Sequence, residues 1–154
     1  MLKNKHVGNI LAVCLSEKKH TPKKNMGEGL LQAFWGVVGD AHAGEPVKQV
    51  SLLASESIKK AQKAGLSIRF GDFGENLVTE GIDLPLLPIG QWLRIGNNIL
   101  LEVTQIGKQC VKPCAIFYKM GDCIMPKEGI FAKVLKGGKV KVGDSIEVVS
   151  AVAY

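Results

Sequence analysis

The stretch Gln91-Trp92-Leu93-Arg94-Ile95-Gly96-Asn97-Asn98-Ile99-Leu100-Leu101-Glu102-Val103-Thr104 decides the class of fold. Two apolar runs, residues 91–95 and 99–104, flank a short turn of glycine and asparagine. Apolar runs separated by a short glycine-containing turn are typical of a β-hairpin. The sequence therefore predicts two neighbouring antiparallel strands at this place in the chain.

Further short apolar runs on both sides of this hairpin predict more strands. A second hairpin is predicted from residues 130–136 and 139–142, because Gly137-Gly138 between them fits a two-residue turn. The other predicted strands cover residues 7–15, 30–38, 49–53, 76–79 and 145–152. Many short strands with glycine-containing turns indicate a barrel or a strongly curved sheet. The predicted fold class is mainly β and barrel-like, with a few short helices packed outside.

Helical character is clearest at residues 55–64. Ser55 is a favourable N-cap, lysines lie toward the C-terminal end, and Gly65 ends the helix. The residues at 89–95 echo those at 142–148, which suggests that the chain approaches a strand in the same way twice.

Length and composition favour one compact domain over residues 1–154, with 46% apolar residues to build its core. No apolar run approaches the length that spans a bilayer, so no membrane association is expected. The N-terminus lacks the apolar region of a signal peptide, which leads us to expect a cytoplasmic protein. Four cysteines in such a chain do not suggest a disulfide scaffold.

The net charge of +6 raises the question of an anionic partner. Nucleic acid is not expected, because only 6% of residues are aromatic and no basic stripe is interleaved with stacking side chains. A small anionic ligand, or simply a basic surface, explains the charge as well.

The segment at residues 107–117 contains two cysteines, two lysines and a proline. Pro113 suits the first position of a helix, so Cys114 is predicted in the first turn of a short helix that Gly121 ends. The N-terminal end of a helix and nearby lysines favour a thiolate. Cys114 is thus a candidate nucleophile or metal ligand. The alternative is that Cys110 and Cys114 are both small, buried apolar residues.

Other clusters are less specific. The four cysteines, at positions 14, 110, 114 and 123, lack the two close pairs that structural zinc sites usually show. His42 lies in the glycine-rich loop 39–46, where it can bind a ligand or simply contact a neighbour. Residues 71–76 can bring backbone N–H groups to an anion or form an ordinary turn. Lys127 is predicted in a turn before a strand, where an anion contact or solvation is expected.

Several phrases in a fixed order resemble the MOSC domain, the C-terminal domain of molybdenum cofactor sulfurases. They lie at residues 39–44, 49–53, 71–84, 87–90, 110–114 and 121–132, and the resemblance extends over about residues 7–148. It implies a β-barrel-like fold that binds a pyranopterin molybdenum cofactor. The cysteine that it implies as catalytic residue and molybdenum ligand is Cys114, while Cys110 is a less secure second thiol.

The resemblance also implies which residues surround the cofactor. His42, Gln49, Glu75 and Asn76 would hydrogen-bond the pterin or its phosphate. Lys48 and Lys127 stand where arginine is expected from the family pattern. Lysine is a point charge and lacks the planar fork with which arginine holds an oxyanion.

The function that the resemblance implies is cofactor binding, or sulfur transfer to the cofactor, in the maturation of molybdoenzymes. The 154 residues hold no pyridoxal-phosphate domain to mobilise sulfur, so the expected partner is a cysteine desulfurase. Two alternatives remain at this stage. One is a molybdenum-dependent reductase of N-hydroxylated compounds that takes electrons from another protein, and the other is a non-catalytic module that binds a small anion or a protein.

Overall fold

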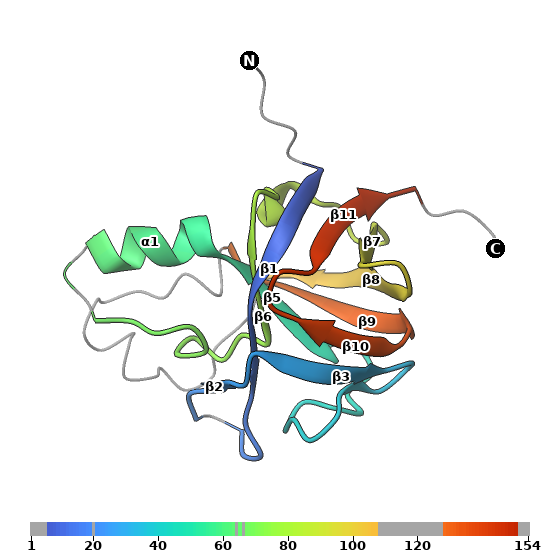
Figure 1. The fold of residues 1–154 in the computed structure, drawn as a ribbon, viewed down its shortest axis with the longest axis horizontal. Helices are drawn as coiled ribbons and strands as arrows, with labels where there is room; N and C mark the ends of the chain where they lie inside the picture. Colours follow the sequence, from blue (N-terminus) through green and yellow to red (C-terminus); the bar gives the residue numbers. More distant parts are fainter. Residues whose placement is uncertain (1–5, 20, 64, 66, 108–127, 151–154) are drawn as a thin grey trace.

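The computed structural model describes residues 6–19, 21–63, 65, 67–107 and 128–150 (Figure 1). Seven strands of the described chain form a closed barrel, in the order β11-β7-β8-β9-β5-β6-β1, with β1 pairing back onto β11. The barrel strands are β1 (Val7–Leu15), β5 (Val50–Ala54), β6 (Leu77–Glu80), β7 (Trp92–Ile95), β8 (Ile99–Ile106), β9 (Ile130–Lys136) and β11 (Ser145–Val149). The predicted mainly β, barrel-like fold is confirmed.

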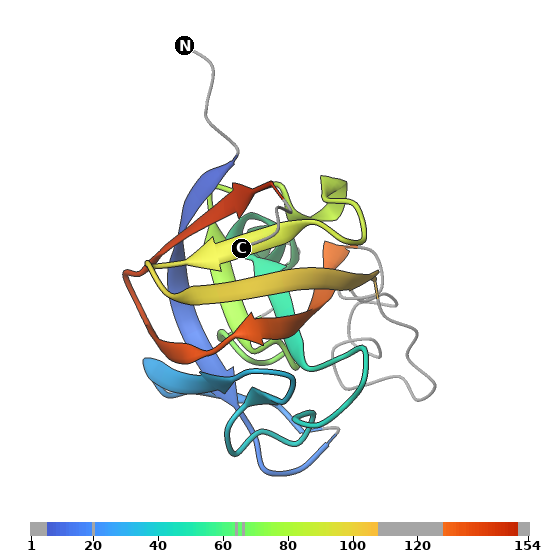
Figure 2. The same ribbon diagram turned by 90° about the vertical axis from the view of Figure 1, so that its right-hand side faces the viewer.

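The hairpin predicted at residues 91–104 is confirmed as β7 and β8. These strands are antiparallel, with Ile95 opposite Ile99 and Trp92 opposite Glu102. On the side of the barrel that faces the viewer in Figure 2, β7 lies between β8 and β11.

The echo between residues 89–95 and 142–148 has a structural counterpart. Gly90 and Gly143 both have positive φ, 95° and 96°, just before β7 and β11. The two strands then pair with each other, and Arg94 forms an ion pair with its register partner Glu147. A glycine with left-handed backbone conformation thus precedes each of these two neighbouring strands.

The second predicted hairpin is wrong in its pairing. The strand β10 (Gly138–Lys141) pairs not with β9 but with β3 (Glu28–Gln32), in a separate sheet of order β10-β3-β4. The corner lies at Gly137, where an added Cβ would stand 2.3 Å from the carbonyl oxygen of Leu31. Gly137 lets the chain bend and pass to another sheet without pairing back on itself. In Figure 1, β10 and β3 lie side by side below the barrel strands.

The single strand predicted at residues 30–38 is also wrong. The chain makes a tight hairpin from β3 to β4 (Gly36–Val37), with Leu31 opposite Val37. Phe34 at its tip has a φ of 56° and donates its N–H to the carbonyl oxygen of Val134. A run of apolar residues carried no signal for this turn, because contacts with β9 help to fix it.

The apolar residues form two layers. The barrel interior is filled by fully buried side chains such as Ile10, Leu52, Leu77 and Leu101. The helix α1 (Ser55–Lys63), confirmed within the predicted range, packs Ile58 and Ala61 against an outer face of the barrel. The remaining short elements are β2 (Lys24–Asn25) and the 3-10 turn η1 (Leu84–Leu86).

Among the described residues, no helix combines the length and the apolar character that crossing a bilayer requires.

Candidate functional site

A buried ion pair joins two loops next to the barrel. Lys23 lies between β1 and β2, and Asp40 follows β4, so neither belongs to a strand. The Nζ atom of Lys23 is 2.8 Å from Oδ1 of Asp40, and their side chains are only 1% and 0% exposed. The Asp40 carboxylate also accepts the N–H groups of Ser16 and His42, at 3.0 and 3.1 Å. A charge at this depth is tolerated because each of its oxygens has a partner.

These contacts decide the protonation of Asp40. Burial by itself opposes ionisation, but the neighbouring His42 and Lys23 side chains and the N–H of Ser16 outweigh it and hold the pKa of Asp40 well below its usual range. Asp40 is therefore a carboxylate at neutral pH.

His42 stands over this ion pair. Its Nδ1 atom is 3.2 Å from Nζ of Lys23, within hydrogen-bonding distance, and 3.7 Å from Oδ2 of Asp40, which is too far. The imidazole is 22% exposed, so part of the ring reaches the surface while Nδ1 faces the buried lysine. Of the predicted pocket residues, His42 thus keeps one side toward solvent.

The loop at residues 71–75 touches the same lysine through its backbone. Lys23 donates its N–H to the carbonyl oxygen of Gly71 at 2.8 Å. A Cβ on Gly71 would lie 2.0 Å from the carbonyl oxygen of Lys23, and the φ of Gly71 is 99°, so only glycine fits. The two sequence phrases around His42 and Glu75 are therefore linked through Lys23, which belongs to neither.

Glu75 is a bond acceptor for its own loop rather than a group aimed at a ligand. Its carboxylate is fully buried and accepts the N–H groups of Gly71 at 2.9 Å and Phe73 at 3.1 Å. Burial raises the pKa of Glu75 to about 7, and the two N–H groups limit the rise. Glu75 therefore titrates in the physiological range.

The raised pKa of Glu75 predicts how stability depends on pH. Because the native state holds this proton more tightly than the unfolded chain, stability falls as pH rises from about 4.5 to about 7. The loss amounts to at most about 3 kcal/mol. Denaturant unfolding of wild type and Glu75→Gln is expected to favour the variant progressively as pH is raised through this window. Parallel pH profiles for the two proteins would contradict the prediction.

Asn76 bridges two barrel strands. Its Nδ2 donates to the carbonyl oxygen of Cys14 in β1 at 3.0 Å, and its Oδ1 accepts the N–H of Ser51 in β5, also at 3.0 Å. The side chain is fully buried. The polar atoms for which the resemblance implies contact with a pterin thus form hydrogen bonds within the fold.

Gln49 is buried and bonded within the fold, whereas Lys48 keeps part of its side chain accessible. Gln49 is 5% exposed, and its Oε1 accepts the N–H of Val134 at 3.0 Å. Lys48 is half-buried and holds its Nζ 5.6 Å from the centre of the Phe131 ring, which is a cation–π distance. Lys48 and His42 are thus the two predicted cofactor-binding residues in the described ranges with surface that a ligand can reach.

Cys14 is the cysteine that the structure describes. It is free and fully buried, and burial together with the nearby Glu75 carboxylate raises the pKa of its thiol to about 12. A thiol in this state is a packing residue and not a nucleophile.

The other sulfur candidates, Cys110, Cys114 and Cys123, lie outside the described residues, as does Lys127. The two ends of the stretch that carries them are described. Gly107 donates its N–H to the carbonyl oxygen of Gly129 at 2.7 Å, so the ends of β8 and β9 are tied together. Glu128 then binds α1, accepting from Ser57 at 3.0 Å and from Lys60 at 2.8 Å. The candidate thiols are therefore attached to the barrel at one point beside the helix.

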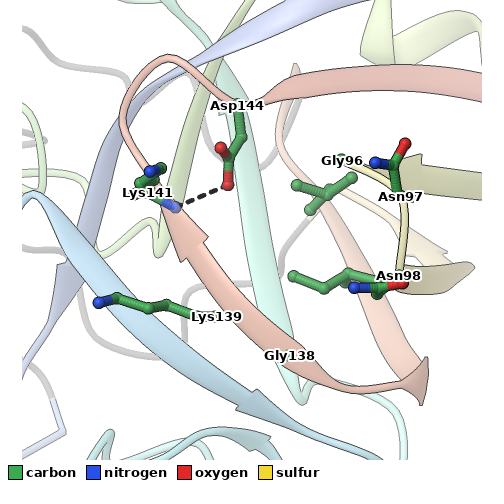
Figure 3. Close-up of a pocket in the computed structure, with 9 residues that line it drawn as sticks. Gly96, Asn97, Asn98, Gly138, Lys139, Lys141 and Asp144 are labelled. Atoms are coloured by element: carbon green, nitrogen blue, oxygen red, sulfur yellow. Dashed lines mark hydrogen bonds between the residues drawn. The ribbon is translucent and has the colours of Figure 1, made fainter.

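A hollow of about 360 Å³ lies elsewhere (Figure 3). It is lined by the turn between β7 and β8 and by β10, with Asp144 accepting the Lys141 N–H at 2.9 Å. It sits at the start of β8, whereas the stretch with the candidate thiols follows the end of that strand. None of the predicted site residues in the described ranges lines this hollow.

Sequence reasoning missed two residues of the site. Asp40 lies in the phrase at residues 39–44 but had no predicted role, and Lys23 lies outside every phrase that carries the resemblance. The 39–44 phrase was a signal for Asp40. Nothing local marks Lys23, because its partner is found only once the fold brings the two loops together. No cluster of three or more His, Cys, Asp or Glu side chains suited to a metal ion occurs among the described residues.

The chain belongs to the MOSC domain family, whose model matches residues 39–147. The structure is similar to the YuaD protein from Bacillus subtilis, with a TM-score of 0.77 at 20% identity over 95% of this chain and 97% of that one. It also resembles YiiM from Geobacillus stearothermophilus, with a TM-score of 0.68 at 19% identity over 93% and 75% of the two chains. For YiiM from Escherichia coli the TM-score is 0.62 at 23% identity over 95% and 72%. These likenesses concern the fold, and no curated protein matches the chain in sequence.

Proposed function

We propose that this MOSC protein binds a molybdenum cofactor through Cys114 and delivers sulfur to it, or carries the cofactor itself, during molybdoenzyme maturation. The observation that supports the proposal is the family match over residues 39–147, which includes Cys114 and is associated with this cofactor. Local sequence supports the same residue, because a cysteine in the first turn of a predicted helix, with lysines nearby in the sequence, is expected to favour a thiolate.

The described residues fit such a ligand in part. His42 and Lys48 have accessible surface and the donors that an anionic or carbonyl-bearing ligand needs. Gln49, Glu75 and Asn76 bond the fold's own backbone, so their role is to hold the loops in place. We therefore assign direct ligand contact to His42 and Lys48 and a supporting role to the other three.

Bound molybdenum would supply a soft acceptor for a thiolate or for sulfur. In the transfer role, the Cys114 thiolate attacks the terminal sulfur of a persulfide on a cysteine desulfurase. A new S–S bond forms on Cys114, the donor S–S bond breaks, and the donor cysteine leaves as a thiolate. Lys127, outside the described residues, is a further basic group that would face the anionic ligand.

The test is the molybdenum and pterin content of protein purified from a host that makes the cofactor. Wild type is expected to retain both, and Cys114→Ala to lose at least about 90% of the molybdenum, since removing a metal-ligating thiolate costs well over tenfold in affinity. Cys110→Ala is the matched control, because it removes a thiol from the same segment and is expected to retain the metal. Equal molybdenum in wild type and Cys114→Ala contradicts the proposal.

A further inference from the structure

The buried pair of Lys23 and Asp40 has a consequence for the imidazole above it. An ammonium group has three protons to donate and no lone pair with which to accept. Within the part of the chain that the structure describes, the Nζ atom of Lys23 has three neighbours at bonding distance, which are Oδ1 of Asp40 at 2.8 Å, Nδ1 of His42 at 3.2 Å and Oγ of Ser16 at 3.3 Å. Each of its protons therefore has one acceptor.

The same count fixes the role of each neighbour. The Ser16 hydroxyl donates its own proton to the carbonyl oxygen of Lys18 at 3.0 Å, which leaves its oxygen free to accept from Lys23. His42 can accept only through a ring nitrogen that carries no proton. Its Nδ1 must therefore be bare, and the ring proton must be on Nε2.

The opposite arrangement, with a proton on Nδ1, finds no acceptor among the described residues. The nearest carboxylate oxygen, Oδ2 of Asp40, is 3.7 Å away and already accepts the backbone N–H of His42 at 3.1 Å. A proton on Nδ1 would also point at the ammonium of Lys23. Geometry and charge thus select one tautomer.

The surroundings of His42 favour a negatively charged ligand. The Glu45 carboxylate nearby has its pKa lowered by the hydrogen bond and charge of Lys19, with a smaller contribution from Lys48. The basic groups around His42 therefore act together on a negative charge at the surface. Glu45 is 35% exposed and bound to Lys19 at 2.7 Å. Its negative charge therefore opposes the binding of an anion only weakly.

We propose that Lys23 and Asp40 are positioning residues that hold His42 as its Nε2–H tautomer, so that His42 is a fixed hydrogen-bond donor to an oxyanion of the ligand. Asp40 holds the lysine and the His42 backbone, and Lys23 holds the ring. The inference deepens the site of the proposed function and rests on it for the identity of the natural ligand. The tautomer itself depends only on contacts within the protein, so it is expected in the protein without cofactor.

The first test is long-range proton–nitrogen NMR of the ¹⁵N-labelled protein without cofactor. His42 is expected to show a bare Nδ1 and a protonated Nε2 as a single tautomer, with its signals assigned through their loss in His42→Gln. A scalar coupling across the hydrogen bond from Lys23 to Nδ1 is expected in wild type. An Nδ1–H tautomer, or a mixture of the two, overturns the proposal.

The variant Lys23→Met removes the donor while keeping an unbranched side chain. If the variant folds, His42 is expected to become a mixture of tautomers, and an unchanged pure Nε2–H form overturns the role of Lys23. If it does not fold, the scalar coupling in wild type decides that role, since its absence means that Lys23 does not hold the ring.

The second test adds inorganic phosphate at low ionic strength. The His42 ring signals of wild type are expected to shift and saturate, and Glu45→Gln is expected to bind about two- to fivefold more tightly. His6 is the internal control for general ionic effects. Equal, unsaturated shifts at both histidines overturn the oxyanion role, whether or not Cys114→Ala loses molybdenum, so the two proposals fail separately.

Discussion

Replacing Asp40 with alanine is expected to lower the free energy of unfolding by about 3–5 kcal/mol. The change leaves the Lys23 ammonium buried without its carboxylate. It also removes the acceptor of the Ser16 and His42 N–H groups. A domain of ordinary stability has about 5–15 kcal/mol in total, so the variant should be close to unfolding. Urea unfolding followed by circular dichroism measures the effect.

The matched control for Asp40→Ala is Glu45→Ala in the same loop. Glu45 also pairs with a lysine, but this pair is exposed, with 49% of the Lys19 side chain and 35% of the Glu45 side chain accessible. Exposed pairs contribute little, so we expect a change of less than about 1 kcal/mol. Similar losses for the two variants would mean that burial of the Lys23–Asp40 pair has no special weight.

Replacing Asn76 with alanine is expected to lower the free energy of unfolding by about 3–5 kcal/mol as well. The variant leaves the carbonyl oxygen of Cys14 and the N–H of Ser51 without their partner inside the protein. Each unsatisfied buried group costs about 1–3 kcal/mol, and the lost side-chain volume adds to this. Thermal and urea unfolding of the purified variant provide the measurement.

The exposed Asn97, in the turn between β7 and β8, offers the control for Asn76. Asn97→Ala makes the same chemical change at the surface and is expected to alter stability by less than about 0.5 kcal/mol. If Asn76→Ala were as mild, Asn76 would be available for a ligand, and its assignment as a bridge between β1 and β5 would be wrong.

The hairpin of β7 and β8 could be predicted from the sequence because its pairing is local. The pairing of β7 with β8 depends on residues a few positions apart, and their apolar runs and turn are visible in the sequence. The pairing of β10 with β3 joins Lys139 to Leu30, which are distant in the chain. Two glycines in a row fit both a hairpin turn and a corner between sheets, and only the contact of Gly137 with Leu31 decides between them.

For the candidate site, too, contacts between residues distant in sequence could not be predicted. The resemblance located the phrases around His42, Gln49, Glu75 and Asn76, because short motifs are visible in one dimension. Their roles depend on partners far away in sequence, such as Val134 for Gln49 and Cys14 for Asn76. The sequence does not distinguish a buried side-chain amide that bonds to backbone from an accessible amide that contacts a ligand.

The hydrogen bond between Gly107 and Gly129 holds two points of the chain together at the edge of the barrel. Since β8 and β9 already pair up to Ile106 and Ile130, the residues between them close a loop whose ends the barrel holds together. The entropic cost of such a loop grows only with the logarithm of its length, by about 0.6 kcal/mol for each doubling. The closure cost therefore changes little with the number of residues that the chain places between Gly107 and Gly129.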